Sequence, residues 1–182
     1  MNGNFDNVLS LVLKDEGGFA NNPKDPGGMT NLGVTKRVWE GFVGHTVDES
    51  EMRALTPALV APLYKQNYWD KVSGDDLPQG LDYAVMDFAV NSGTGRAAKF
   101  LQQICGVTAD GSIGQITIDA VNNADPVDLI DQLCDKRLAF LKSLPTFATF
   151  GKGWSARVAR VKAAAEGMAQ QAQSAAGGSS DN

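Results

Sequence analysis

Three side chains near the N-terminus have the types and spacing that acid–base chemistry requires. Glu16 is followed nine positions later by Asp25 and fourteen positions later by Thr30, in a segment rich in glycine and proline. Two carboxyl groups in unlike surroundings can divide the hydrolysis of a glycosidic bond, because one protonates the leaving oxygen and the other activates water or stabilises positive charge. The spacing therefore makes Glu16, Asp25 and Thr30 candidate catalytic residues.

Glu16 is the candidate general acid, because it continues the apolar face of a predicted helix. Apolar residues recur from Phe5 to Leu13 with the spacing of an amphipathic helix, and Glu16 lies on the same side. Burial and the negative end of a helix both disfavour the charged form of a carboxyl group, and a general acid must hold its proton. The alternative is that Glu16 pairs with an arginine and closes the helix end.

Asp25 and Thr30 lie in a glycine-rich segment, residues 17–35, that has too few apolar residues to fill a core. Long loops inside compact domains are usually functional or disordered. Since glycine tolerates backbone angles that other residues resist, we expect the segment to fold back and bring both side chains opposite Glu16. The alternative for both residues is a role in a turn, because Lys-Asp-Pro-Gly favours turns.

The remaining sequence predicts a mainly α protein. Capping residues and apolar periodicity indicate helices that begin near Asn4, Thr35 and Thr56. Further helices are expected over residues 81–92, 96–105, 115–122, 126–143 and 154–168, and the first of these is apolar on nearly all sides, as in a buried central helix. Short strands are expected only within residues 19–35. Residues 169–182 are small and polar and predict a disordered tail.

The N-terminal segment resembles the signature of the glycoside hydrolase family 108 muramidases, which occur in phage endolysins and in bacterial wall-remodelling enzymes. The matching residues are Glu16-Gly17-Gly18-Phe19, Asp25-Pro26-Gly27-Gly28-Met29-Thr30 and Gly33-Val34-Thr35. Their order also resembles the Glu, Asp, Thr catalytic triad of phage-type lysozymes, with the aspartate at the same offset and the threonine one residue nearer. The resemblance implies a lysozyme-like helical domain with a Gly-rich active-site loop, which can include a small β-hairpin, and with Glu16 as the catalytic glutamate.

Two later segments extend this resemblance. Tyr68-Trp69 and the segment Asp87-Phe88-Ala89-Val90-Asn91-Ser92-Gly93 resemble the Y-W and D-x-A-V-N-x-G segments of the same family. The resemblance makes Tyr68, Trp69, Asp87 and Asn91 candidate substrate-binding residues, and the last two lie four positions apart on one helix face. The alternative is that these two residues satisfy buried backbone groups, and we favour it for Asp87.

The second half of the chain resembles a helical peptidoglycan-binding domain. Residues 109–117, Ala-Asp-Gly-Ser-Ile-Gly-Gln-Ile-Thr, resemble its motif D-G-x-x-G-P-x-T, with Gln115 in place of the usual proline. The expected organisation is a catalytic muramidase domain over residues 1–93, packed against a helical peptidoglycan-binding lobe over residues 94–168. The tail over residues 169–182 follows.

The two resemblances together imply an endolysin-type lysozyme that hydrolyses the β-1,4 bond between N-acetylmuramic acid and N-acetylglucosamine in peptidoglycan. A lytic transglycosylase is the alternative enzyme, since it needs one acid–base glutamate and uses the muramic 6-hydroxyl in place of water. A non-catalytic peptidoglycan-binding module is the alternative outside enzymes, although binding alone does not need a half-buried acid. We expect peptidoglycan glycan strands as the partner, and a monomer.

Composition argues against several other classes. A net charge of −5 argues against nucleic-acid binding, and no apolar run is long enough for stable membrane insertion. The chain shows no cluster of the residue types that bind zinc, and we expect neither a metal nor a cofactor. Its start lacks the features of a signal peptide. We therefore expect synthesis in the cytoplasm and action on periplasmic peptidoglycan after release, in a phage's host cell or by bacterial secretion.

Two further features leave alternatives open. Cys105 and Cys134 are either two thiols or one disulfide. The stretch from Lys136 to Lys162 holds seven basic residues and no acidic one, which is either a solvated helix face or a surface for anionic polymers or membranes. Within it, the helical spacing predicts that Arg157, Arg160 and Lys162 point outward.

Overall fold

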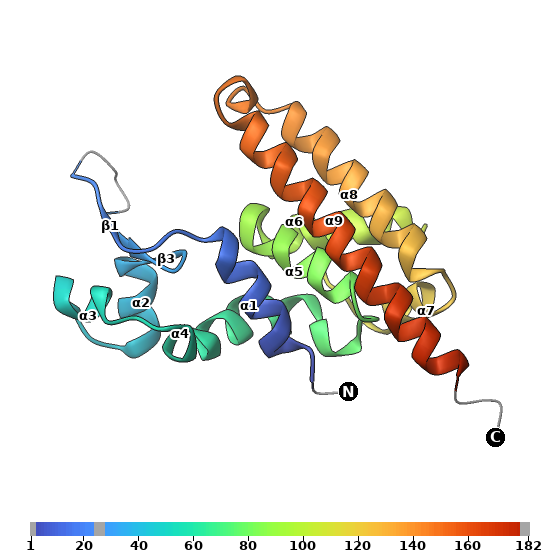
Figure 1. Cartoon of the computed structure of the whole chain (residues 1–182), viewed down its shortest axis with the longest axis horizontal. Helices are drawn as coiled ribbons and strands as arrows, with labels where there is room; N and C mark the ends of the chain where they lie inside the picture. Colours follow the sequence, from blue (N-terminus) through green and yellow to red (C-terminus); the bar gives the residue numbers. More distant parts are fainter. Residues whose placement is uncertain (1–2, 24–27, 179–182) are drawn as a thin grey trace. The chain divides into compact units, whose positions relative to one another are not determined.

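A computed structural model describes residues 3–23 and 28–178, so the candidate Asp25 lies outside the described residues. The chain forms two compact units, an N-terminal unit of residues 5–67 and a C-terminal unit of residues 68–182 with residues 1–4 (Figure 1). Within the described residues there are nine α-helices and one small antiparallel sheet. The predicted mainly α class is therefore confirmed.

The N-terminal unit contains four helices and the sheet. Its elements are α1 (Phe5–Asp15), β1 (Ala20–Asn21), β2 (Met29–Asn31), β3 (Val34–Thr35), α2 (Lys36–Val43), α3 (Glu49–Arg53) and α4 (Pro57–Tyr64). The caps predicted at Thr35 and Thr56 are present, because Thr35 accepts a hydrogen bond from the N–H of Val38 and Thr56 accepts one from that of Leu59. The short helix α3 was not predicted from the sequence, although Asp48 caps it in the same way.

The sheet confirms the short strands expected within residues 19–35. Its order is β1-β2-β3, and Thr30 in the central strand pairs with Ala20 on one side and Thr35 on the other. The turn between β2 and β3 consists of Leu32 and Gly33, with φ angles of 50° and 73°. A two-residue turn with positive φ at both positions matches the twist of the flanking strands, so it closes a tight hairpin.

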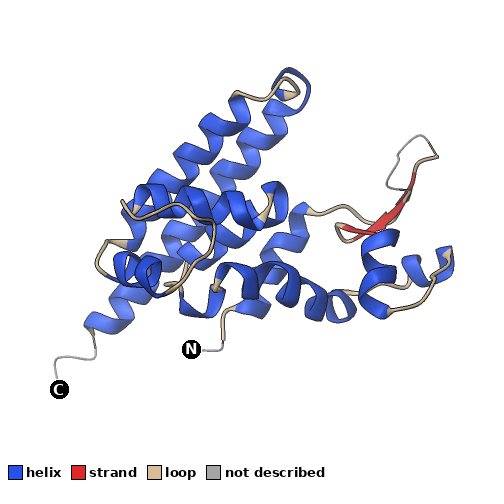
Figure 2. Ribbon diagram, turned by 180° about the vertical axis from the view of Figure 1, so that it is seen from behind, coloured by secondary structure: helices blue, strands red, loops and turns tan. Residues whose placement is uncertain are grey.

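The C-terminal unit is helical. The chain enters it through the π-helical turn η1 (Lys65–Trp69) and the 3-10 turns η2 (Asp70–Val72) and η3 (Gly74–Asp76). The helices are α5 (Leu81–Ser92), α6 (Thr94–Ile104), α7 (Gln115–Asn122), α8 (Pro126–Lys142) and α9 (Phe147–Gly177). Nine of the twelve residues of α5 are buried, and α6, α8 and α9 pack around it (Figure 2). The predicted central buried helix is therefore confirmed.

The last helix is longer than the sequence predicted. It begins at Phe147 and continues to Gly177, so the described residues 169–177 of the predicted disordered tail are helical. Ala169 is 1% exposed, and a Cβ on Gly80 would lie 3.0 Å from its backbone nitrogen, so α9 packs closely on the start of α5 here. A segment whose composition is typical of a tail is therefore helical, and its first residue is buried. The domain boundary after residue 93 stays a prediction, and the compact units divide the chain after residue 67.

Both cysteines are free thiols, with Cys105 half-buried and Cys134 buried. Burial raises the pKa of Cys134 to about 12. Across residues 3–23 and 28–178, no helix is both long enough and apolar enough to span a lipid bilayer.

Candidate active site

Glu16 lies directly after α1, where the buried face of the helix reaches the protein surface. The N–H of Glu16 donates to the carbonyl of Leu13 at 3.3 Å, which extends the last helical turn by one residue. Leu13 and Val12 on the same face are buried, whereas Glu16 is half-buried. The side chain therefore follows the apolar face, as the periodicity predicted, but keeps access to solvent.

The carboxyl group of Glu16 and the hydroxyl of Tyr64 both lie against the backbone of Gly33. A Cβ placed on Gly33 would lie 2.8 Å from Oε2 of Glu16 and 2.5 Å from the oxygen of Tyr64. These distances are too short for any side chain at this position, and the φ of 73° also favours glycine. The carboxyl group of Glu16 and the hydroxyl of Tyr64 are thus neighbours, and both occupy the space that a side chain at position 33 would need.

Leu32, the residue before Gly33, is held by hydrogen bonds at both ends of its backbone. Its N–H donates to the carbonyl of Gly17 at 2.9 Å, and its carbonyl accepts from the hydroxyl of Tyr64 at 2.7 Å. A leucine at φ 50° is uncommon and persists only where the surroundings fix it. Because Gly17 follows Glu16 directly, the first bond ties the hairpin turn to the end of α1, and the second ties it to the end of α4.

Thr30 belongs to the same unit as Glu16, in the central strand of the hairpin, and is half-buried. The sheet that contains Thr30 continues into the Leu32–Gly33 turn, so one hairpin carries both Thr30 and the residues that contact Glu16. Asp25 precedes this strand and lies outside the described residues, so its predicted position opposite Glu16 stays a prediction.

Tyr64 was missed in the sequence analysis. It is the last residue of α4 and is 1% exposed, and its hydroxyl donates a hydrogen bond to the Leu32 carbonyl. A signal existed, because a tyrosine that ends an apolar helix face is expected to bury its ring and find a partner for its hydroxyl. Nothing in the sequence identified that partner.

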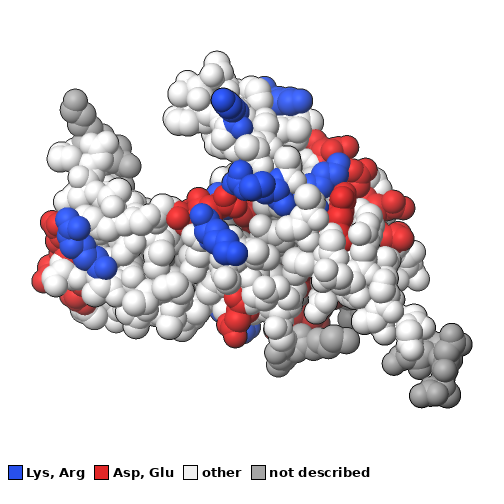
Figure 3. All heavy atoms as spheres, in the orientation of Figure 1, with Lys and Arg blue, Asp and Glu red and all other residues white. Residues whose placement is uncertain are grey.

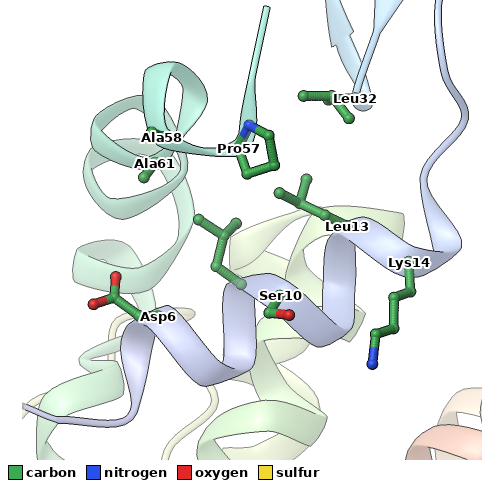
Figure 4. A pocket seen from close by; sticks show the side chains of 9 residues that line it. Asp6, Ser10, Leu13, Lys14, Leu32, Pro57, Ala58 and Ala61 are labelled. Atoms are coloured by element: carbon green, nitrogen blue, oxygen red, sulfur yellow. The ribbon is translucent and has the colours of Figure 1, made fainter.

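An apolar groove of about 420 Å³ runs between α1 and α4 in the same unit (Figure 4). Its walls come from Asp6, Leu9, Ser10, Leu13, Lys14, Leu32, Pro57, Ala58 and Ala61. Glu16 does not line this groove. Leu13 and Leu32 do, so the turn that contacts the glutamate also forms part of the groove wall.

Comparison with known proteins gives two family matches and a similar solved structure. Residues 9–93 match the family described as Glycosyl hydrolase 108, and residues 96–159 match one described as Predicted Peptidoglycan domain. The solved structure of Brucella abortus SagA is 47% identical, with a TM-score of 0.82, and the alignment covers 93% of this chain and 97% of that one. The chain belongs to the glycosyl hydrolase 108 family. No curated protein matches it.

Membership of glycosyl hydrolase family 108, together with the second match, makes the chain a lysozyme-like peptidoglycan hydrolase with a peptidoglycan-binding domain. The first match contains Glu16, Thr30 and Tyr64. The candidate substrate-binding residues of the family-108 region, Tyr68, Trp69, Asp87 and Asn91, lie in the C-terminal unit.

Trp69 of the Y-W segment is buried, at 1% exposure. Its indole N–H donates to Oδ1 of Asp75 at 3.0 Å, and a Cβ on Gly74 would lie 2.4 Å from its ring. The ring is therefore packed against the backbone, which makes it unsuited to stacking on a sugar. Tyr68 is half-buried, and its predicted contact with substrate stays a prediction.

Asp87 is fully buried and does not line a cleft. Its Oδ2 accepts a hydrogen bond from Arg137 at 2.7 Å, and its Oδ1 accepts one from Arg157 at 2.8 Å. The burial agrees with the alternative that the sequence favoured, but the partners are two arginine side chains and not the backbone groups that it named. Asn91, one turn later, is exposed, and its Oδ1 accepts from the hydroxyl of Ser92 at 3.2 Å. Its predicted role in binding stays a prediction.

The same ion pairs correct the interpretation of the basic stretch. Arg157 and Arg137 bind Asp87 and do not point outward, because the buried carboxylate needs their charge. Lys162 pairs with Asp131 and with Asp135, and the hydrogen bond to Asp131 raises its pKa. On the face drawn in Figure 3, basic side chains lie beside acidic ones. Three of the seven basic residues, Arg137, Arg157 and Lys162, therefore form ion pairs within the unit.

The loop over residues 109–114, before α7, is organised by one buried amide. Gln102, at 1% exposure, donates to Oδ1 of Asp110 at 2.8 Å and to the carbonyl of Ser112 at 2.9 Å, and it accepts from the N–H of Gly111. The hydrogen bond from Gln102 lowers the pKa of Asp110. The Asp and Gly of the peptidoglycan-domain motif thus fix the loop. Gln115, which replaces the usual proline, opens α7.

Proposed function

We propose that this family-108 protein is an N-acetylmuramidase, which hydrolyses the β-1,4 bond between N-acetylmuramic acid and N-acetylglucosamine with Glu16 as the general acid. The observation that supports this proposal is the placement of the Glu16 carboxyl group. It lies half-exposed at the end of α1, against the backbone of Gly33 and beside the hydroxyl of Tyr64.

In this reaction Glu16 gives its proton to the glycosidic oxygen as the bond to the sugar C1 breaks. Positive charge then develops on the sugar ring, and a water molecule attacks C1 and returns a proton to the enzyme. We assign the orientation of that water to Thr30 and the support of the positive charge to Asp25. The role of Asp25 rests on its place in the sequence motif.

The runner-up reaction differs in its nucleophile. A lytic transglycosylase protonates the same oxygen but lets the 6-hydroxyl of muramic acid attack, which leaves a 1,6-anhydromuramic end. Mass spectrometry of the glycan fragments separates the two reactions, because the hydrolytic product contains one more molecule of water. Reducing muramic ends are expected, and anhydro ends would replace the muramidase proposal by the transglycosylase one.

The first experiment is lysis of permeabilised Gram-negative cells, followed by turbidity, with wild type and Glu16→Gln. The substitution keeps the shape of the side chain and removes its transferable proton, so the rate is expected to fall about 10²–10⁴-fold. Glu49→Gln is the matched control, because Glu49 is exposed on α3 and pairs with Arg53. A Glu16→Gln variant that retains more than about a tenth of the activity would refute Glu16 as the acid.

A further inference from the structure

The hairpin turn beside Glu16 is fixed by contacts from outside the hairpin. The Leu32 carbonyl accepts from the hydroxyl of Tyr64 on α4, and the Leu32 N–H donates to the carbonyl of Gly17. Leu32 and Gly33 both have positive φ, at 50° and 73°. A leucine holds this conformation only where surrounding groups determine it, and these two hydrogen bonds provide that restraint.

The fixed turn limits the space open to the Glu16 side chain. The site where Gly33 would carry a Cβ lies 2.8 Å from Oε2 and 3.0 Å from Cγ of Glu16, so the side chain rests on the Gly33 backbone. The same site lies 2.5 Å from the Tyr64 oxygen. A movement of the turn would therefore change which rotamers the glutamate can adopt.

Tyr64 can restrain the turn because burial fixes the position of its own side chain. It is 1% exposed and ends α4, whose Val60 and Leu63 are also buried. Its phenol has a single proton, which the Leu32 carbonyl accepts. The hydroxyl thus acts on the turn as a donor.

We propose that Tyr64 is a positioning residue for Glu16: its hydrogen bond to the Leu32 carbonyl holds the Leu32–Gly33 turn against the glutamate and so directs the carboxyl group at the glycosidic oxygen. This inference rests on the proposed function of Glu16. Catalysis is sensitive to such placement, because a displacement of about 1 Å can cost about a hundredfold in rate.

The test is Tyr64→Phe, which removes the hydroxyl and keeps the buried ring. On soluble peptidoglycan glycan fragments, well below the melting temperature of each protein, kcat is expected to fall about 10- to 100-fold with KM within about twofold. An unchanged kcat would overturn the inference.

A double-mutant cycle separates positioning from a general loss of structure. If Tyr64 acts through Glu16, adding Tyr64→Phe to Glu16→Gln should leave the small residual rate unchanged, as measured at high enzyme concentration. If the second substitution slows Glu16→Gln by the same factor as it slows wild type, the positioning role is refuted. A fully active Glu16→Gln, seen before Tyr64 is varied, would instead refute the proposed function on which this inference rests.

A second variant probes the same contact without altering the tyrosine. Gly33→Ala places a Cβ against both Glu16 and Tyr64 and is expected to lose at least as much activity as Tyr64→Phe. Gly44→Ala is the matched control, because Gly44 has a φ of 80° in the same unit and no atom within 4 Å of its Cβ position. Equal activity of the two alanine variants would overturn the inference.

Discussion

Arg157 on α9 donates a 2.8 Å hydrogen bond to Oδ1 of Asp87 on α5, which lies 70 residues earlier in the chain. Arg137 on α8 donates to the other oxygen at 2.7 Å, so one buried carboxylate joins three helices. The Asp87 side chain is 0% exposed and that of Arg157 is 12% exposed. Because the Asp87 carboxylate is removed from water, the stability of the fold depends on both arginine partners that compensate its charge.

A substitution that reverses the charge of Arg157 should therefore destabilise the protein. Arg157→Glu brings a second carboxylate to Asp87, and breaking a buried ion pair costs about 3–5 kcal/mol. Thermal and urea unfolding followed by circular dichroism measure the loss. Lys152→Glu, on an exposed position of the same helix, is the control and should change stability by less than about 0.5 kcal/mol. Equal stability of the two variants would contradict a structural role for Arg157.

Binding to whole sacculi should depend on the aromatic side chains at the start of α9. Phe150 is 53% exposed and stacks on Trp154 at a centroid distance of 5.7 Å, within the region that matches the peptidoglycan domain. Exposed apolar groups gathered in this way often mark binding surfaces. We expect Phe150→Ser with Trp154→Ser to weaken sedimentation with purified sacculi about tenfold, or about 1.4 kcal/mol.

The control for this pair is Ile116→Ser, because Ile116 on α7 is 76% exposed and lies in the same matched region. It should bind sacculi like wild type. The aromatic pair would lose its assigned role if the double variant and Ile116→Ser bound equally well.

The stability of the C-terminal unit should fall as the pH rises from about 4 to about 6. Burial raises the pKa of Asp82 from 3.8 to about 6, in spite of the hydrogen bonds from Asn4 and from the N–H groups of Tyr83 and Gly80. In this window the folded state holds a proton that the unfolded state releases, so the stabilisation is complete below about 4 and is lost as the pH passes 6.

Asp82→Asn should remove this pH dependence. The variant carries no charge at the site, so its stability relative to wild type should improve by about 2 kcal/mol between pH 4 and pH 8. Asp76→Asn removes one charge from an exposed neighbouring position and controls for net charge. Denaturant unfolding at pH 4 and pH 8 gives the free energy of unfolding of each protein. If the difference between Asp82→Asn and wild type is the same at both pH values, the raised pKa of Asp82 is contradicted.

Substitution of Asp25 or Thr30 should lower the rate of lysis and leave the fold intact. Asp25→Asn is expected to reduce the lysis rate by at least about tenfold, and Thr30→Ala by less, because each supports a step that Glu16 begins. Melting temperatures should stay within a few degrees of wild type. A full rate for Asp25→Asn, together with anhydromuramic products, would support transglycosylation.

The sequence by itself determined the local structure and the family. Apolar spacing from Phe5 to Leu13 predicted α1 and the direction of Glu16, and Thr35 and Thr56 predicted helix starts, because caps and periodicity act over one or two turns. The motif around Glu16 indicated the family that the comparisons then showed. Such features are local, so a single chain segment contains all the information that they need.

Tertiary structure alone decided which distant groups meet. The spacing within α9 predicted an exposed Arg157, whereas the buried carboxylate of Asp87 holds it inside, since a charge removed from water must find an opposite one. Likewise, the sequence placed Tyr64 at the end of a helix but could not show that its hydroxyl meets Leu32, which lies 32 residues earlier. Residues 169–177 had the composition of a tail, but they continue α9, and Ala169 packs against the start of α5. In each case the partner is supplied by a different helix or turn, so no local pattern specifies it.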